Sequence, residues 1–506
     1  MFKYYALLLS MVVCTTDILH GADYFQIQVV DAETERGIPL VELETVNQIL
    51  HVTDSKGIVA FDEPGLMNQE VYFFLRSHGY SYPKDGFGFN GKKLNVKPGG
   101  KAVIKMKRIN VAQRLYRVTG GGIYRDSLLV GAPVPLQEPV LNGRVLGSDS
   151  VVNTLFKNKV YWFWGDTNKP GYPLGNFDVP GAVSELPARG GLRIQQGVDL
   201  DYFLDETGFA KKTCDMPGEG PTWIDALVTL KDESGVERLF AKYVKVKAPM
   251  TVYERGLVEF NDELKQFDKQ KVFDFDALLY PVGHPVKYKM EGVEYVLFGL
   301  AAPLTRVSAS PSVLANLAEY ETYTYLKPGT ENEQWVIDRD SQGQLRYQWR
   351  KNLPPLSYDL EQKLILQGKL SAEEGYFYLC DIETKRPLQI HNSSVAWNAY
   401  RKKWTMIASQ KFGTSVLGEI WYSEAESPLG PWKWARKIVT HNKYSFYNPK
   451  QHPMFAEEKG RLIYFEGTYT TLFSGNDVKT PRYDYNQIMY QLDLSDPRLA
   501  PELFQQ

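Results

Sequence analysis

The sequence contains little cysteine and no long apolar segment beyond its N-terminus. Only three of the 506 residues are cysteine, and two of them, Cys214 and Cys380, are far apart. Two distant cysteines do not make a disulfide scaffold, and they either pair with each other or are buried separately. No segment after residue 22 has the length of a membrane-spanning helix. We therefore expect a globular chain with no membrane span.

The sequence also lacks an excess of charge of either sign. It has 58 Lys and Arg against 60 Asp and Glu, a formal net charge of −2, and no long run of one sign. Nucleic acid and anionic membrane surfaces call for a basic face on the protein. We therefore expect no nucleic-acid partner, and a neutral or modestly charged ligand fits the composition better.

Several common catalytic motifs are missing as well. The chain has no Gly-x-Ser-x-Gly string, no His-Glu-x-x-His string and no signature of a Cys–His nucleophile. No closely spaced His, Asp or Glu residues have the spacing of a metal site. Serine hydrolase, zinc peptidase and cysteine peptidase chemistry are not predicted, and we expect neither a metal nor a cofactor.

The N-terminus has the order of a secretory signal peptide. Lys3 precedes an apolar run over residues 4–16, and the small residues Gly21 and Ala22 follow. The run is too short to span a membrane. We expect residues 1–22 to be a signal peptide cleaved near Ala22, and the protein to be secreted or periplasmic.

Aromatic residues are abundant, with 32 Tyr, 25 Phe and 10 Trp. Aromatic and β-branched side chains suit a pleated, half-buried surface, so this bias favours strands over helices. Aromatic faces also stack on sugar rings, whereas an all-β core alone is rich in Tyr and Phe. Composition therefore predicts an all-β fold and leaves the role of the aromatics open.

Residues 23–108 read as a series of short strands with alternating apolar and polar side chains. The strings at Val30–Thr34, Gly37–Val41 and Thr53–Gly57 resemble the carboxypeptidase regulatory-like, or transthyretin-like, β-sandwich. That resemblance implies an accessory module of about 85 residues and nothing catalytic. Residues 109–147 read as a connector, in which the triplet Gly120–Gly122 permits tight backbone. No Lys-Ser/Thr ending follows the triplet, so it is not a phosphate loop.

From residue 148 to residue 506 the chain repeats a theme of strand, turn and strand, dense in aromatics. Four-stranded units at such spacing build a β-propeller, and five units fit this length. The third unit carries an insertion near 305–375, with the best helix candidates at Pro311–Tyr320 and Leu360–Leu370. We also assign Met454–Ala456 to a strand of the last unit. A large β-sandwich or a right-handed β-helix is the competing architecture.

The most telling string is Ser423–Trp432, which reads Ser-Glu-Ala-Glu-Ser-Pro-Leu-Gly-Pro-Trp and follows Gly418–Tyr422. It resembles the outer part of a blade in five-bladed glycoside hydrolase propellers of family 43 and its relatives. Its Pro and Gly residues fix a turn, so the string indicates fold rather than catalysis. The string Tyr447–Pro453 resembles the opening of a last blade in sugar-active propellers, and Trp162–Asn168 is similar to uncharacterised bacterial propeller proteins.

Glycoside hydrolysis by the usual route requires two carboxyl groups. The family resemblance implies a base from the first blade, which would be Asp149 with Asp166 as its rival, and a pKa-tuning Asp225 from the second. The third blade would supply a glutamic acid, but His284 stands at its entrance. Glu254 and Glu321 are the possible substitutes. An Asx-turn at a strand start is the alternative role for Asp149 and Asp166.

We expect the remaining candidate residues to bind substrate. Trp162, Trp164, Trp223 and Tyr447 would form a sugar platform. His284, His391 and His452 stand at blade entrances and would orient substrate hydroxyls, or else be packed core histidines.

Three hypotheses of function follow. The first is a secreted glycoside hydrolase that acts on a polysaccharide by acid–base catalysis in the propeller funnel. The second is a non-catalytic propeller that binds a glycan or a protein at the cell envelope. The third is a polysaccharide lyase, in which Tyr447, His452 and Arg482 would replace the carboxyl groups. Carbohydrate, as an oligosaccharide or polysaccharide, is the expected partner.

Overall fold

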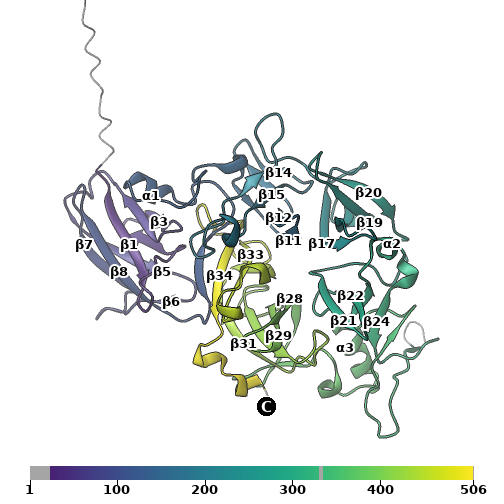
Figure 1. The fold of residues 1–506 in the computed structure, drawn as a ribbon. Coiled ribbons are helices and arrows are strands. Elements are labelled where there is room, and N and C mark those ends of the chain that lie inside the picture. Colours follow the sequence, from purple (N-terminus) through teal and green to yellow (C-terminus); the bar gives the residue numbers. More distant parts are fainter. Residues whose placement is uncertain (1–22, 330–333, 505–506) are drawn as a thin grey trace, which may run out of the picture.

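The computed structural model describes residues 23–329 and 334–504. The predicted signal peptide lies outside these residues. The described chain is built almost wholly of strands, in a small N-terminal part and a ring of five sheets (Figure 1). The predicted all-β fold with a propeller is confirmed. The N-terminal part, residues 23–108, is called the sandwich below.

The N-terminal part consists of two four-stranded sheets around one apolar core. Alternate residues of each strand point into this core, as in β1, where Phe25, Ile27 and Val29 are buried. In the first sheet β1 pairs parallel to β8 and antiparallel to β4. The first sheet has the order β4 (Ile58–Phe61), β1 (Phe25–Asp31), β8 (Lys101–Arg108) and β6 (Tyr80–Ser81). The second has the order β3 (Leu50–Val52), β2 (Glu42–Thr45), β5 (Glu70–Arg76) and β7 (Gly91–Asn95).

Five sheets form the ring, each starting with its innermost strand (Figure 1). Blade 1 contains β11 (Val152–Phe156), β12 (Lys159–Phe163), β15 (Gly181–Ser184) and β16 (Asp201–Tyr202). Blade 2 contains β17 (Thr222–Lys231), β18 (Glu237–Lys247), β19 (Thr251–Asn261) and β20 (Gln266–Val272). Blade 3 contains β21 (Val286–Met290), β22 (Val293–Phe298), β23 (Thr305–Ser308), β24 (Glu321–Thr324) and β25 (Gln348–Arg350).

Blade 4 has six strands, in the order β28 (Ile390–Asn398), β29 (Lys403–Gln410), β30 (Ile420–Ala425), β31 (Trp434–Val439), β26 (Leu379–Asp381) and β27 (Pro387–Leu388). Blade 5 contains β32 (Ser445–Gln451), β33 (Leu462–Thr470), β34 (Asn486–Asp493) and β9 (Gln113–Arg117). A small sheet of β10 (Gly147–Ser148), β13 (Thr167–Lys169) and β14 (Tyr172–Asn176) stands beside blade 1. The predicted strand Met454–Ala456 is wrong, because Pro453–Phe455 forms a 3-10 turn and β32 is the inner strand.

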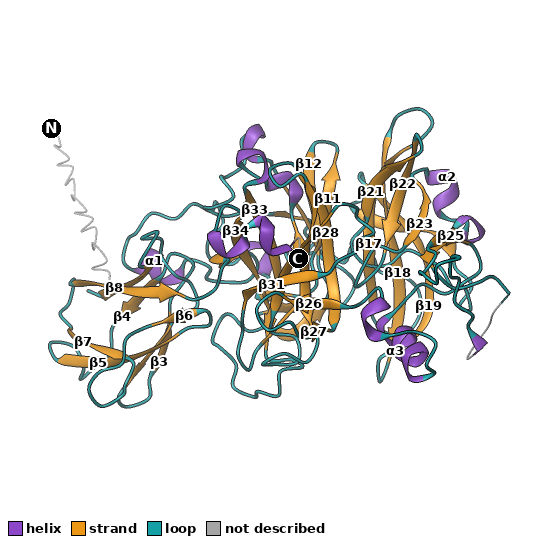
Figure 2. Cartoon of the chain, turned by 90° about the horizontal axis from the view of Figure 1, so that it is seen from below, coloured by secondary structure: helices purple, strands orange, loops and turns teal. Residues whose placement is uncertain are grey.

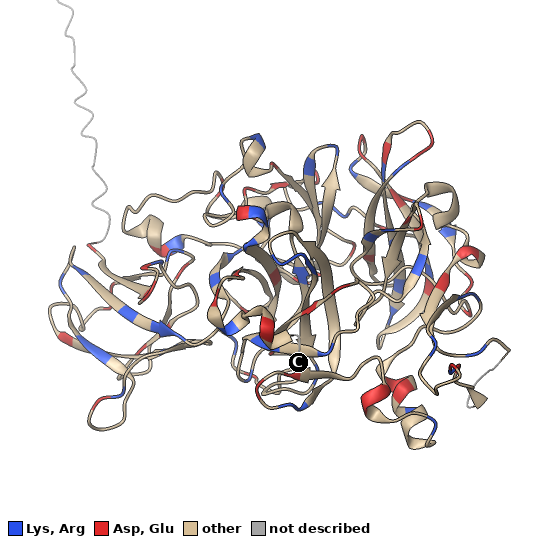
Figure 3. Cartoon of the chain, turned by 60° about the horizontal axis from the view of Figure 1, so that its bottom comes forward, with Lys and Arg blue, Asp and Glu red and all other residues tan. Residues whose placement is uncertain are grey.

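The few helices lie at the edges of the strand layers (Figure 2). They are α1 (Arg125–Leu129), α2 (Pro311–Leu314) and α3 (Tyr358–Leu366). Helix α2 falls within the helix candidate Pro311–Tyr320, and α3 overlaps the candidate Leu360–Leu370 but begins at Tyr358. Ser357 caps α3 by accepting from the Leu360 N–H. No helix in the described residues is long and apolar enough to cross a membrane. Lys and Arg positions are interspersed with Asp and Glu positions along the ribbon of both parts of the molecule (Figure 3).

The chain closes the ring with a strand from its N-terminal side. Strand β9 lies within the range that we assigned to a connector, and it pairs antiparallel with β34 as the outer strand of blade 5. Arg114 on β9 is almost fully buried and donates to the carbonyl oxygens of Pro39 and His78. One strand therefore both closes the propeller and attaches the sandwich to it.

The apolar cores of the propeller lie between neighbouring blades. One cluster joins each adjacent pair, and the cluster between blades 4 and 5 also includes Leu40 and Val52 of the sandwich. Because neighbouring blades cover both faces of a blade, its middle strands are largely buried on both sides. In β33 all nine residues are buried.

Candidate functional site

The polar side chains near the axis come from the first strands of the blades and from the loops that precede them. Asp149 lies in the loop between β10 and β11, in blade 1. The Tyr447 hydroxyl, from β32 of blade 5, donates to Asp149 Oδ2 at 2.7 Å. Burial raises the pKa of Asp149, and hydrogen bonds from Tyr447, Tyr485 and Ser150 oppose that increase. Asp149 thus joins the first blade to the last one.

Asp166 lies against Asp149. A Cβ on Gly165 would stand 2.2 Å from Asp149 Oδ1, so only glycine allows the two segments to approach so closely. Burial raises the pKa of Asp166 to about 7, and the neighbouring Asp149 charge adds to the increase. The indole N–H of Trp223 donates to Asp166 Oδ1 at 2.8 Å. The first blade therefore contributes two coupled carboxyl groups, and one of them holds a proton near neutral pH.

Asp225 is on the inner strand of blade 2. It is two residues beyond Trp223 on β17, so both side chains point to the same face of the strand, and both are partly exposed. The Lys242 ammonium lies 2.7 Å from Asp225 Oδ1, and the Gly283 N–H donates to Oδ2 at 3.0 Å. Lys242 and the Gly283 N–H thus hold both carboxyl oxygens of Asp225. Trp223, which donates to Asp166, links that carboxyl of raised pKa to the inner strand that carries Asp225.

Glu254, the substitute for the missing acid, does not join this group. It lies on β19, the third strand of blade 2, where it accepts from the Tyr243 hydroxyl at 2.6 Å and pairs with Lys269 at 2.7 Å. Both contacts lower the pKa of Glu254 against the opposing effect of burial. Glu321, on β24, pairs with Arg306 in the same way. Neither glutamate is placed on an inner strand.

Two of the expected platform residues belong to the apolar core instead. Trp162 and Trp164 are 0% and 1% exposed, stack on each other and pack in the cluster between blades 1 and 5. A side chain with no exposed face cannot stack on a sugar, so their assignment to substrate binding is corrected to core packing. Trp223 is partly exposed and keeps an accessible position beside Asp166.

The three histidines have different surroundings. His452 is fully buried, with Nδ1 at 2.9 Å from the Asn153 amide and Nε2 at 3.4 Å from Glu466, so it is a packed interblade residue. His284 is 7% exposed, and its Nε2 has no hydrogen-bond partner among the described residues. His391, on β28, is partly exposed and lines a cavity of about 340 Å³ between blades 3 and 4, together with Tyr280 and Lys411.

The lyase hypothesis required Tyr447, His452 and Arg482 to act together. Arg482 instead pairs with Asp126 of α1 at 3.0 Å, near the sandwich. Tyr447 donates to Asp149, and His452 is enclosed beside Glu466. The three residues therefore have separate partners and do not form one constellation.

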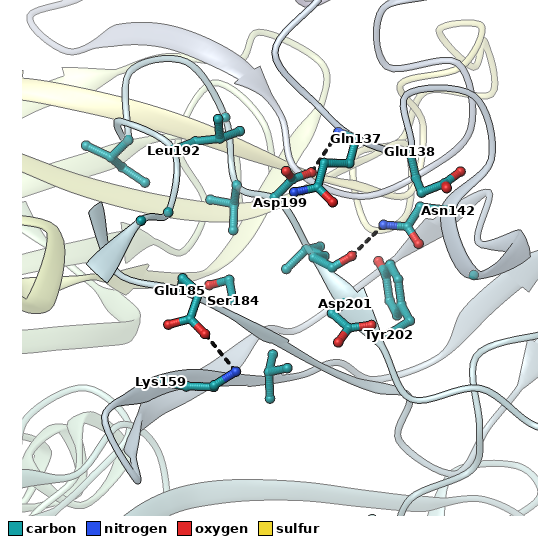
Figure 4. Close-up of a pocket in the computed structure, with 18 of the residues that line it drawn as sticks. Gln137, Glu138, Asn142, Lys159, Ser184, Glu185, Leu192, Asp199, Asp201 and Tyr202 are labelled. Atoms are coloured by element: carbon teal, nitrogen blue, oxygen red, sulfur yellow. Dashed lines mark hydrogen bonds and ion pairs between the residues drawn. The ribbon is translucent and has the colours of Figure 1, made fainter. Parts of the chain in front are cut away.

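A larger cavity of about 720 Å³ lies at the outer edge of blade 1, away from these residues (Figure 4). Its polar side chains are largely engaged: Lys159 pairs with Glu185 at 2.7 Å, and Asp199 accepts from the Gln137 N–H at 3.0 Å. Residues 23–329 and 334–504 contain no cluster of three or more His, Cys, Asp or Glu suited to a metal ion. Cys214 and Cys380 are both buried and both free.

Sequence reasoning missed four residues near the axis. Lys242 and Tyr485 contact the candidate carboxyls, while Tyr280 lines the cavity and Lys450 lies on β32. Lys450 stands inside the string Tyr447–Pro453 that was noted for its resemblance. A lone lysine or tyrosine in a strand is usually solvated or packed, so only strand order could have singled these residues out.

Comparison with solved structures returns glycoside hydrolases, including members of the family that the sequence resembles. An exo-β-1,3-galactanase from Phanerochaete chrysosporium matches with 10% identity and a TM-score of 0.38, over 69% of this chain and 61% of its own. A family 43 enzyme from Xanthomonas citri matches with 11% identity and a TM-score of 0.33, over 69% of this chain and 87% of its own. An exo-1,5-α-L-arabinanase from a bovine ruminal metagenomic library has 8% identity and a TM-score of 0.34, with 69% and 94% coverage.

The match thus spans less than two thirds of the galactanase. With TM-scores below 0.5, these likenesses carry no statement about the activity of this chain. No family model matches the sequence, and no curated protein does.

Proposed function

We propose that the chain is a secreted glycoside hydrolase that cleaves a polysaccharide with carboxyl groups at the propeller axis. The observation that carries the proposal is that the partly exposed Trp223 bonds to Asp166, whose pKa is raised, and shares a strand face with Asp225, which pairs with Lys242. Glycoside hydrolysis needs one carboxyl to protonate the leaving oxygen and another to act as base or nucleophile.

Asp166 takes the role of the acid in this proposal, because its pKa of about 7 leaves it protonated at mildly acidic to neutral pH. Asp225, held beside Lys242, is the second carboxyl of the proposal, the base or nucleophile. Burial, and after it the neighbouring Asp149, raise the pKa of Asp166, while Tyr447 and Tyr485 hold Asp149 in place. Trp223 offers an aromatic face for a sugar ring next to both groups.

The test is the release of reducing ends from arabinans, xylans, galactans and uronate-rich polysaccharides by residues 23–506. Asp166→Asn and Asp225→Asn are each expected to lower the rate at least about 100-fold, the lower range for loss of a general acid or base. Glu254→Gln, which removes a carboxyl from the third strand of blade 2, is the matched control and should retain the activity.

The same assay separates the alternatives. Ultraviolet absorbance is read in parallel to detect unsaturated products. Such products would show that the chain cleaves by elimination, as a lyase does, and not by hydrolysis. A glycan retained in a pull-down without any turnover would make the chain a binding propeller, and Asp166→Asn would then leave retention unchanged. Equal activity of the Asp166→Asn, Asp225→Asn and parent proteins would overturn the two-carboxyl proposal.

A further inference from the structure

The cavity of about 340 Å³ between blades 3 and 4 has mostly apolar walls. In blade 3 they come from the loop before β21 and the loop between β22 and β23. The segment at the start of α3 and the start of β28 in blade 4 supply the rest. Leu278 and Leu300, from the two loops of blade 3, line the cavity although each is 50% exposed. Apolar side chains from separate loops that stay accessible around one cavity are typical of a binding site.

Each wall of this cavity is held by contacts of its own. The Arg255 guanidinium, from β19, lies 3.9 Å from the centre of the Tyr280 ring. The Ser393 N–H, from β28, donates to the carbonyl oxygen of Leu300 at 2.8 Å. The N–H of Phe377 donates at 3.0 Å to a buried glutamate of α3. The cavity is therefore formed before any ligand arrives, which lowers the entropy cost of binding.

The cavity adjoins the candidate carboxyl Asp225. The Lys242 ammonium lies 2.7 Å from Asp225 Oδ1 and 5.9 Å from the centre of the ring of Tyr280, which lines the cavity. Val282 lines the cavity as well, and the N–H of the next residue, Gly283, donates to Asp225 Oδ2 at 3.0 Å. One short segment of chain therefore forms a wall of the cavity and also holds the carboxyl.

The walls and the volume fit an aromatic group better than a bare sugar. Sugar hydroxyls placed against apolar walls would lose their hydrogen bonds to water without replacement. A cavity of about 150 Å³ accommodates benzene, so this one has room for a ring and a short chain. Tyr280, Tyr358 and Phe377 line it, and aromatic pairs gain more than their buried area provides.

Two polar side chains line the same cavity. They are Lys411 and His391, and in the part of the chain that the structure describes neither side chain has a hydrogen bond or an ion pair. The Lys411 ammonium can donate to an oxygen at the polar end of a ligand whose ring fills the apolar part.

We propose that this cavity binds an aryl group on a short linker, carried by the sugar on which the site at Asp225 acts. The inference rests on the proposed function and narrows its substrate class to carbohydrates that bear an aromatic substituent. Two sources share this chemistry: an aromatic acyl ester on a polysaccharide and the aryl aglycone of a glycoside.

The test measures binding by calorimetry on residues 23–506, with Asp166→Asn in place of the parent wherever a probe contains a glycosidic bond. The sugar-free probes are methyl 3-phenylpropanoate and methyl acetate. The sugar probes are disaccharides of arabinose, xylose and galactose, each free, as the acetyl ester, as the 3-phenylpropanoyl ester and as the 3-phenylpropyl glycoside. We expect methyl 3-phenylpropanoate to bind and methyl acetate not to bind, because an acetyl group leaves most of the cavity unfilled.

The variants change the accessible leucines of the cavity. Leu278→Asn combined with Leu300→Asn should weaken the binding of methyl 3-phenylpropanoate about tenfold, as expected for about 60 Å² of lost apolar contact. Leu264→Asn is the matched control, because Leu264 is 54% exposed but stands in the turn between β19 and β20, outside the cavity. Equal melting temperatures of the double variant and the parent show that the variant is folded, and Leu300→Asn alone replaces it if they differ.

The sugar probes identify the source of the aryl group. An ester that binds more tightly than both its free disaccharide and methyl 3-phenylpropanoate assigns the cavity to an acyl substituent, and the same gain for the glycoside alone assigns it to an aglycone. No gain from any attached sugar restricts the cavity to free aromatic molecules and overturns the inference.

Equal binding of methyl 3-phenylpropanoate by the double variant and the parent, or no binding by either, also overturns the inference. Failure of the proposed function has a different signature. In that case the parent releases no reducing ends from any polysaccharide, while the aryl probe still binds in the cavity and still depends on the two leucines.

Discussion

Asp166→Asn is expected to make the protein more stable at alkaline pH and to leave its stability unchanged at acidic pH. The reason is the raised pKa of this carboxyl, about 7 in the folded protein against an ordinary value of 3.8. Ionisation is therefore harder in the folded protein than in the unfolded chain. The resulting cost is absent below pH 3.8, grows as the pH rises, and levels off above pH 7.

The size of the effect follows from the same numbers. A shift of about 3 pH units at about 1.4 kcal/mol per unit gives roughly 4 kcal/mol at pH 8, an upper figure because the side chain is partly exposed. A cooperative unit of about 400 residues unfolds with an entropy of roughly 0.8 kcal/mol/K, so the melting temperature would rise by up to about 5 °C. Asn retains an oxygen that can accept from the Trp223 indole.

The assay is calorimetric melting of parent and variant at pH 4, 6 and 8 in one buffer series. The difference in melting temperature between variant and parent should increase from pH 4 to pH 8. Glu254→Gln is the control of opposite sign, because the pKa of that carboxyl is lowered and its removal should not stabilise the protein at pH 8. The reasoning about Asp166 would be refuted by a melting-temperature difference that is the same at all three pH values. It would also be refuted by a variant that is less stable than the parent at pH 8.

Three further predictions follow from the site. Hydrolysis by the parent should decline as the pH passes about 7, because Asp166 then loses its proton, and a pH–rate profile with no such limb contradicts its role as the acid. Trp162→Ala should lower the free energy of unfolding by about 3–5 kcal/mol, measured by urea denaturation, without weakening the binding of a glycan by the folded fraction, because Trp162 is fully buried. Arg482→Ala should leave the rate of polysaccharide cleavage per folded molecule unchanged, since the Arg482 guanidinium pairs with Asp126 near the sandwich. A large loss of that rate would instead support the lyase hypothesis.

The blades could be predicted from sequence because their signals are local. Runs of apolar and aromatic residues predict strands such as β12 and β22, and the Pro and Gly residues of Ser423–Trp432 predict a turn there. The pairing partner of strand β9 could not be predicted from the sequence. Residues 113–117 pair with a strand more than 360 residues later in the chain, and no periodicity in the sequence encodes that distance.

The site could be predicted only in part, because strand order decides which side chains reach the axis. Asp149 and Asp166 stand just before strands, and Asp225 lies in the first half of β17, and local reasoning can find such positions. Whether an aromatic residue faces a ligand or a neighbouring blade depends on whether other blades cover both sides of its strand. Trp162 and Trp223 both stand in strand-like segments of the sequence, yet Trp162 is buried and Trp223 is partly exposed.

The candidate site lies at the seam where the ring closes, and this makes its integrity depend on both ends of the chain. Asp149 of blade 1 is held by Tyr447 and Tyr485, which belong to blade 5. Blade 5 is complete only when β9, from before the propeller, pairs with β34. Arg114 on that same strand binds the sandwich. A disturbance that frees β9 would therefore loosen the tyrosines that position Asp149, and through Asp149 it would lower the pKa of Asp166, since the neighbouring charge and the burial that raise it would both weaken.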